Sequence, residues 1–169
     1  MENMPFPIFM LLSATDNLLL FYLGLGLVGA TRPPFRRLLA AALANALFSF
    51  VVRNQLLVPG VHIIFQIPFA ILSLIVICNL SAIYSTLATL LGLIIMALTQ
   101  TLVELITVNV SGIPFQVLMN TPKLHLVWAI PDFLACLLII ILIDRLGITP
   151  FDFRAVLQRQ EKTDEDKQS

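Results

Sequence analysis

Charged residues are scarce in this 169-residue sequence: they make up 12% of it, whereas hydrophobic residues make up 59%. A soluble domain averages about 25% charged and 45–50% apolar residues. The mean hydropathy of +0.96 reflects the same imbalance. We therefore expect an integral membrane protein. Ten basic and ten acidic residues leave no net charge, which argues against a nucleic-acid partner.

Cysteines, targeting signals and lipidation signals are also few. Cys78 and Cys136 both lie in apolar runs and form no Cys-x-x-Cys motif, so we interpret them as small buried hydrophobes. No basic residue precedes the first apolar run, which favours a retained helix over a cleaved signal peptide. No glycine follows Met1 and the chain does not end in a C-a-a-X box, so no lipid anchor is expected.

Catalytic motifs are missing as well. The sequence contains no H-E-x-x-H, Walker A or G-x-G-x-x-G motif. Cys136 follows His125 by roughly three helical turns, and Cys78 is expected at the membrane side opposite both histidines, so no Cys–His pair is predicted. We expect no enzyme, no cofactor and no metal site.

Five apolar segments are each long enough to cross a membrane, which takes about 20 residues. Polar or turn-forming stretches separate them, although the boundary after the third segment carries no charge. The fold class that we predict is an all-α polytopic membrane protein, with a five-helix transmembrane bundle over residues 1–146. The expected spans are 6–30, 35–57, 61–79, 84–108 and 124–146.

Basic residues determine the predicted orientation. Arg32, Arg36 and Arg37 flank the first loop, and Arg145 begins a second basic region at the end of the last span. Five crossings put both regions on one side, which the positive-inside rule makes cytoplasmic. We predict a multi-pass protein of a bacterial inner (cytoplasmic) membrane, with the N-terminus outside and the C-terminus inside. Residues 147–169 are predicted to form a short cytoplasmic amphipathic helix and a disordered charged tail.

Polar side chains within the spans are costly in lipid, so they tend to face a bundle interior or a wet cavity. At about 1.5 Å of rise per residue, those of this chain fall at similar depths, in the outer half of the membrane or near its midplane. We therefore predict an outward-facing polar pocket. Its candidate ligand-binding residues are Asp16, Arg53, His62, Gln66, Gln100, Glu104 and Asp132.

A structural network is the alternative to a pocket. Arg53 would then pair with Glu104 or Asp132 and hold the helices in register. However, three carboxylates share one deep arginine, so at least one carboxylate lacks an obvious basic partner. In a pocket, the arginine would hold an anionic group and the carboxylates a cation or amine. Pro68 and Pro131 are expected to bend two of the helices and could open a cavity.

Small residues indicate where the first two helices approach each other. Gly26 and Ala30 are four positions apart in the first segment. Ala42 and Ala46 are four apart in the second. Such spacing allows close helix packing in membranes. We predict an antiparallel pair, with Asn45 bonding across the seam.

Several pieces of the chain resemble a known family of membrane proteins. They include LGLGL from Leu23, PFRRL from Pro34, GVHIIF from Gly60, the helix with Glu104, LMNTP at 118–122, and Pro131 with Asp132. Over residues 10–146 the chain resembles the membrane-embedded N-terminal sensor region of Firmicutes histidine kinases of the GHKL ATPase type. The resemblance implies a bundle that senses an extracellular or membrane signal. Residues 147–169 leave no room for kinase domains, so signalling would need a separate partner.

We therefore predict a non-enzymatic, sensor-like membrane protein that binds a ligand in the polar pocket and signals through a cytoplasmic partner. Two alternatives remain open: a substrate-binding subunit of a small-solute transporter, and a structural subunit of a membrane complex. The expected partners are the lipid bilayer, a cytoplasmic kinase or another membrane subunit, a small-molecule or peptide ligand, and a second copy of the chain in a homodimer.

Overall fold

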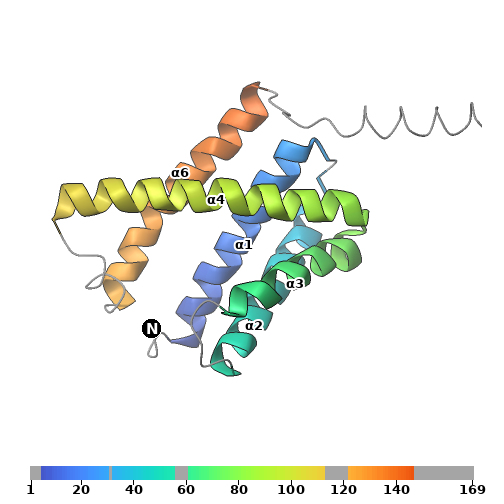
Figure 1. The fold of residues 1–169 in the computed structure, drawn as a ribbon, viewed down its shortest axis with the longest axis horizontal. Coiled ribbons are helices and arrows are strands. Elements are labelled where there is room, and N and C mark those ends of the chain that lie inside the picture. Colours follow the sequence, from blue (N-terminus) through green and yellow to red (C-terminus); the bar gives the residue numbers. More distant parts are fainter. Residues whose placement is uncertain (1–4, 31, 56–60, 113–121, 147–169) are drawn as a thin grey trace, which may run out of the picture.

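The computed structural model describes residues 5–30, 32–55, 61–112 and 122–146. This part of the chain is all-helical (Figure 1), which confirms the all-α part of the predicted fold class. Each helix lies within a few residues of a predicted span. The helices are α1 (Phe6–Val28), α2 (Phe35–Gln55), α3 (Val61–Cys78), α4 (Ala82–Ser111) and α6 (Pro122–Leu146). The predicted tail after residue 146 lies outside the described residues.

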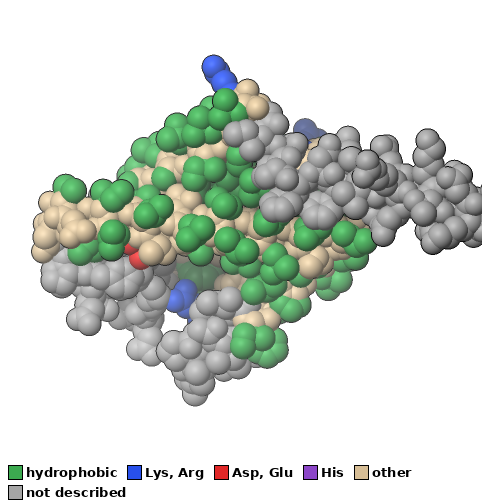
Figure 2. Space-filling view, turned by 45° about the horizontal axis from the view of Figure 1, so that its top comes forward, with side chains coloured by type: hydrophobic (Ala, Val, Ile, Leu, Met, Phe, Trp, Pro, Cys, Tyr) green, Lys and Arg blue, Asp and Glu red, His purple; other side chains and the backbone are tan. Residues whose placement is uncertain are grey.

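Three of these helices are long and apolar enough to cross a membrane, and they identify the chain as a candidate helical membrane protein. They are α1, the part Phe35–Arg53 of α2, and α4. Helix α3 contains a shorter apolar stretch, Ile64–Cys78. Among the described residues, these three helices are the ones that meet both criteria, length and apolar composition. The two criteria therefore do not establish the five predicted crossings. Hydrophobic side chains cover much of the visible surface (Figure 2), as lipid contact requires.

Helix α1 lies at the centre of the bundle and packs against α2, α4 and α6. Most of its second half is buried: Phe21, Leu23, Leu25 and Val28 are each 0% exposed. A helix that is apolar all round is the kind that the core of a bundle accommodates. The remaining helices are arranged around it, so α1 positions the polar groups that the other helices bring inward.

Helix α4 crosses α1 and α6 obliquely (Figure 1). At the α1–α4 crossing the two backbones are in direct contact, because a Cβ atom at Gly24 would overlap the carbonyl oxygen of Ala88. Likewise, a Cβ atom at Gly92 would overlap the carbonyl oxygen of Leu20. Glycines at such a contact let membrane helices approach closely and gain packing energy.

The length of α4 agrees with its oblique course. Its 30 residues extend for about 45 Å at 1.5 Å per residue, whereas the hydrocarbon core of a bilayer is about 30 Å thick. A helix that is too long for the bilayer commonly tilts. The depths of residues on α4 therefore depend on its tilt as well as on their positions in the sequence.

The predicted seam between α1 and α2 is present. The two helices pack against each other, and Ala42 and Ala46 are both fully buried. Asn45 donates a hydrogen bond from Nδ2 to Oδ1 of Asn17 on α1, which confirms the predicted bond across the seam. Gly26 does not belong to this seam, because a Cβ atom there would meet a side chain of α6 at 3.4 Å.

Candidate functional site

Polar residues from three helices gather where α1, α4 and α6 meet. Asp132 on α6 lies within electrostatic range of Asp16 on α1 and of Glu104 on α4. Gln100, one turn before Glu104, lies in hydrogen-bonding range of Asp132. We call these four residues the carboxylate cluster. They are four of the seven residues singled out from the sequence.

Asp132 is the member of the carboxylate cluster that interacts with each of the other three. Its Oδ1 atom is buried and accepts no hydrogen bond from any residue that the structure describes. Gln100 is half-buried, whereas Asp16 and Glu104 are more accessible. Leaving a buried acceptor unsatisfied costs about 1–3 kcal/mol. The Oδ1 atom is therefore suited to accept a hydrogen bond from a donor outside this part of the protein.

Local helix geometry explains why these side chains converge. Gln100 and Glu104 are four residues apart on α4, so they share one face of the helix. Pro131 lies inside α6, directly before Asp132. A proline has no amide hydrogen, so the carbonyl one turn earlier loses its helical partner and the helix bends there. Pro131 thus removes a helical hydrogen bond next to the central carboxylate of the cluster.

The other predicted site residues have different surroundings. The guanidinium carbon of Arg53, near the end of α2, is 5.8 Å from the ring centre of Phe9. Gln66 on α3 accepts a hydrogen bond from the Ser49 hydroxyl at 3.5 Å. His62 belongs to the first turn of α3, but its side chain is outside the described set. These contacts join α2 to α1 and α3, whereas the carboxylate cluster joins α1, α4 and α6.

Figure 2 shows a hollow below α4, with acidic and basic side chains visible at its rim. On the face that is visible, charged side chains are otherwise confined to the opposite end of the molecule. On this face, the charged side chains of the described residues are thus concentrated in two regions.

An ion pair at that opposite end was not predicted from the sequence. Arg32, in the loop after α1, donates from Nη1 and Nη2 to Oδ2 and Oδ1 of Asp144 on α6, at 2.8 and 2.5 Å. Its guanidinium carbon also lies 5.2 Å from the ring centre of Tyr22. The hydrogen bonds to Asp144 raise the pKa of Arg32. The pair shows that the α1–α2 loop lies against the end of α6. In the sequence, this ion pair was indicated by the opposite charges at two predicted inner helix ends.

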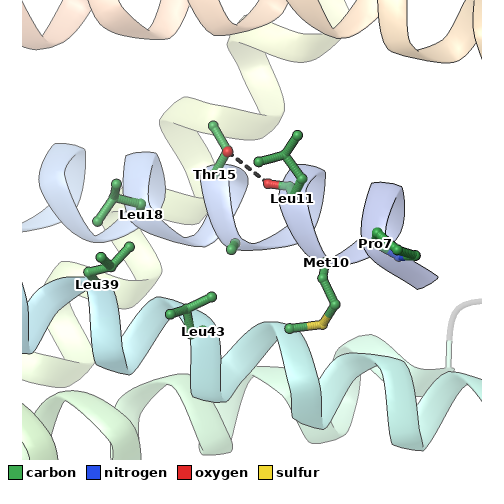
Figure 3. Close-up of a pocket in the computed structure, with 8 residues that line it drawn as sticks. Pro7, Met10, Leu11, Thr15, Leu18, Leu39 and Leu43 are labelled. Carbon is green, nitrogen blue, oxygen red and sulfur yellow. Dashed lines mark hydrogen bonds between the residues drawn. The ribbon is translucent and has the colours of Figure 1, made fainter. Parts of the chain in front are cut away.

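Two surface grooves lie elsewhere on the bundle. The first, between α1 and α2, has a volume of about 340 Å³, and Figure 3 shows Met10, Leu18, Leu39 and Leu43 around it. The Thr15 hydroxyl in this groove donates to a backbone carbonyl of its own helix at 2.8 Å, so the groove offers little polar chemistry. The second, about 410 Å³, lies beside the Arg32–Asp144 ion pair. Neither groove is lined by a residue of the predicted site.

No group of three His, Cys, Asp or Glu side chains that could hold a metal ion occurs among the described residues. The chain matches no family model. No curated protein and no solved structure matches it either. Functional inference therefore starts from the chain's own residues and their geometry.

Proposed function

We propose that this chain is a non-enzymatic, sensor-like membrane protein that binds a cationic group of its ligand at the carboxylate cluster. One observation carries the proposal: the buried Oδ1 of Asp132 has no partner among the described residues, while Asp16 and Glu104 lie within electrostatic range. Three helices supply the cluster, so a ligand bound there would couple the positions of α1, α4 and α6.

An amine or guanidinium group fits this cluster chemically. Its N–H groups would donate to Asp132, and hydrogen bonds between ionised groups are about twice as strong as neutral ones. Its charge would also relieve the repulsion between neighbouring carboxylates, which is greater in the low dielectric of a bundle than in water. The amide of Gln100 can orient the Asp132 carboxylate. Arg53, His62 and Gln66 would contact other parts of the ligand, with Arg53 facing an anionic group.

The proposal includes a topology. All five described helices cross the inner membrane, with the N-terminus outside, the carboxylate cluster open to the exterior and the C-terminus in the cytoplasm. The arginines around the first loop and at the end of α6 support this orientation. The ion pair between Arg32 and Asp144 supports placing both regions at one surface. Ligand binding would reach a cytoplasmic kinase or another subunit through the end of α6.

Binding of organic cations to the purified full-length chain tests the proposal. The probes are spermidine and a short arginine-containing peptide, and isothermal titration calorimetry measures the affinity. We expect Asp132→Asn to weaken binding by about 10-fold or more, because a hydrogen bond to a charged group contributes about 1.5–3 kcal/mol. Asp144→Asn is the matched control, since it removes a carboxylate from the same helix outside the cluster.

Two results would contradict this function. The parent chain could bind neither probe, in which case the cluster is not a cation site. Alternatively, the two substitutions could weaken binding equally, which would make the effect one of overall charge and not of the Asp132 position.

A further inference from the structure

The bundle end at which α1 stops and α2 starts carries a basic surface that the proposed ligand site does not use. Among the described residues it holds four arginines against a single aspartate. We call this surface the basic end. It consists of Arg32, Arg36, Arg37 and Arg145, together with Asp144.

Several contacts place these residues at one end of the bundle. Arg32 is bonded to Asp144, which directly precedes Arg145 in α6. Arg36 and Arg37 belong to the first turn of α2, immediately after the loop that contains Arg32. Arg37 is also within electrostatic range of the last residue of α3. The ends of α1, α3 and α6 and the start of α2 therefore meet here.

Most of the positive charge at the basic end is unpaired. Asp144 neutralises Arg32 through two hydrogen bonds. Arg36, Arg37 and Arg145 are exposed, and none of them forms an ion pair within the part of the chain that the structure describes. Three exposed guanidinium groups at the ends of apolar helices form a surface suited to phosphate, which arginine can bind through two parallel hydrogen bonds.

The 410 Å³ groove extends this surface toward the apolar part of the bundle. It is lined by the Arg32–Asp144 pair together with Leu25 of α1 and Ile143 of α6. Glycine and alanine residues also line it, and their small side chains leave space beside α6. At Gly26, an added Cβ atom would lie 2.9 Å from Nη2 of Arg32. The lining of the groove therefore combines charged and apolar side chains, which suits an amphipathic ligand.

We propose that the basic end binds anionic phospholipids, with the lipid phosphate on the exposed arginines and an acyl chain in the groove beside Arg32. The apolar helices α1 and α2 are long enough to cross a membrane, so their ends would lie at the level of the headgroups. Anionic lipids attract basic residues near that level. This inference is independent of the ligand that the carboxylate cluster takes.

Thermal unfolding of the purified full-length chain in detergent tests the inference. The midpoint is followed while short-chain phosphatidylglycerol, short-chain phosphatidylcholine or inorganic phosphate is added. A bound ligand raises the midpoint with its concentration. We expect phosphatidylglycerol to raise the midpoint well beyond the other two additives. The triple variant Arg36→Gln, Arg37→Gln and Arg145→Gln should lose this response, with affinity falling about fivefold per arginine.

Lys123→Gln is the matched control, because it removes a basic residue from the end of α6 opposite Arg145 and should keep the phosphatidylglycerol response. The single variant Arg36→Gln, with its smaller expected loss, serves as the test if the triple variant does not fold. An equal response to both lipids, or to inorganic phosphate, would overturn the inference. So would a triple variant that is destabilised without lipid yet keeps the lipid response, because the arginines would then act within the chain.

Discussion

Single polar side chains carry much of the specificity of this bundle, because its apolar surface is nearly uniform. Asn45 and Asn17 are 1% and 3% exposed, and they join α2 to α1 through their side-chain amides. Several threonines instead donate to carbonyls of their own helix, as Thr89 and Thr99 do at 2.8 Å. The bond between the two asparagines specifies which helices pair. A threonine bond within one helix only satisfies a hydroxyl group that would otherwise face lipid.

Asp132 provides the sharpest test at the scale of one residue. We predict that Asp132→Asn raises the stability of the ligand-free chain at neutral pH, by about 1 kcal/mol or more. The physical reason is that replacing buried charges is often neutral or stabilising when they are poorly compensated, and Asp132 lies within electrostatic range of two further carboxylates. Denaturant titration of the purified protein measures the change.

Glu104→Gln is the companion variant, because Glu104 is the more accessible carboxylate and its loss should change stability less. A marked loss of stability in Asp132→Asn would favour the structural network, in which that carboxylate holds the helices together. It would then count against a binding pocket at this position.

At the scale of the elements, the crossing of α1 and α4 is the tightest packing feature. It depends on glycines at which no side chain fits. We predict that Gly92→Leu destabilises the bundle by about 1–3 kcal/mol or more, the usual cost of overpacking, because the new side chain would meet the Leu20 carbonyl. A backbone atom cannot move aside as a flexible side chain can. Thermal unfolding in detergent measures the effect.

Ala97→Leu is the control for added volume on the same helix, since Ala97 lies on an exposed face of α4. It should leave the unfolding midpoint nearly unchanged. Equal midpoints for Gly92→Leu and the parent would mean that α1 and α4 do not approach each other this closely in the folded protein.

Across the whole molecule, the proposed function requires an odd number of membrane crossings. We predict that a tag on the N-terminus can be labelled from outside intact cells, and that a fluorescent protein fused to the C-terminus is active in the cytoplasm. The basic residues near Arg32 and Arg145 favour this orientation. Finding both termini on one side would contradict five crossings and would invert the predicted exposure of the carboxylate cluster.

The Arg32–Asp144 ion pair links that topology to the proposed signal. Its side chains are 31% and 44% exposed, so the pair contributes at most about 1 kcal/mol and can open without unfolding the bundle. Because it joins the α1–α2 loop to the last turn of α6, a shift of α6 on ligand binding would act on this contact. That is the route by which the carboxylate cluster would influence the cytoplasmic surface.

Much of the secondary structure was predictable because length and hydropathy alone specify a helix in lipid. The helix starts at Phe6 and Phe35 coincide with the predicted span limits. The hydrogen bond of Asn45 across the α1–α2 seam was also predictable, because an amide side chain between small apolar residues has few other hydrogen-bonding groups within reach. The partner itself, Asn17, was not singled out, because it lies in an apolar run that offers several equivalent faces.

The close approach of Gly24 and Gly92 could not be read from the sequence. The second half of α1, from Leu18 to Val28, is apolar on every side, so no face of it indicates which neighbour it meets. The run LGLGL offers two glycines, and the structure turns Gly24 toward α4 and Gly26 toward α6. Which residues of a uniformly apolar helix meet which neighbour depends on packing among all the helices.

The sequence by itself determined that this chain is built of apolar helices, roughly where they begin and end, and which costly polar groups they carry. Tertiary structure alone decided which of those groups meet. It joined Asp132 to residues of α1 and α4, gave Arg53 and Gln66 other surroundings, and paired Arg32 with Asp144. The physical reason is that hydropathy depends on composition along one helix, whereas contacts depend on the crossing angles and rotations of several helices at once.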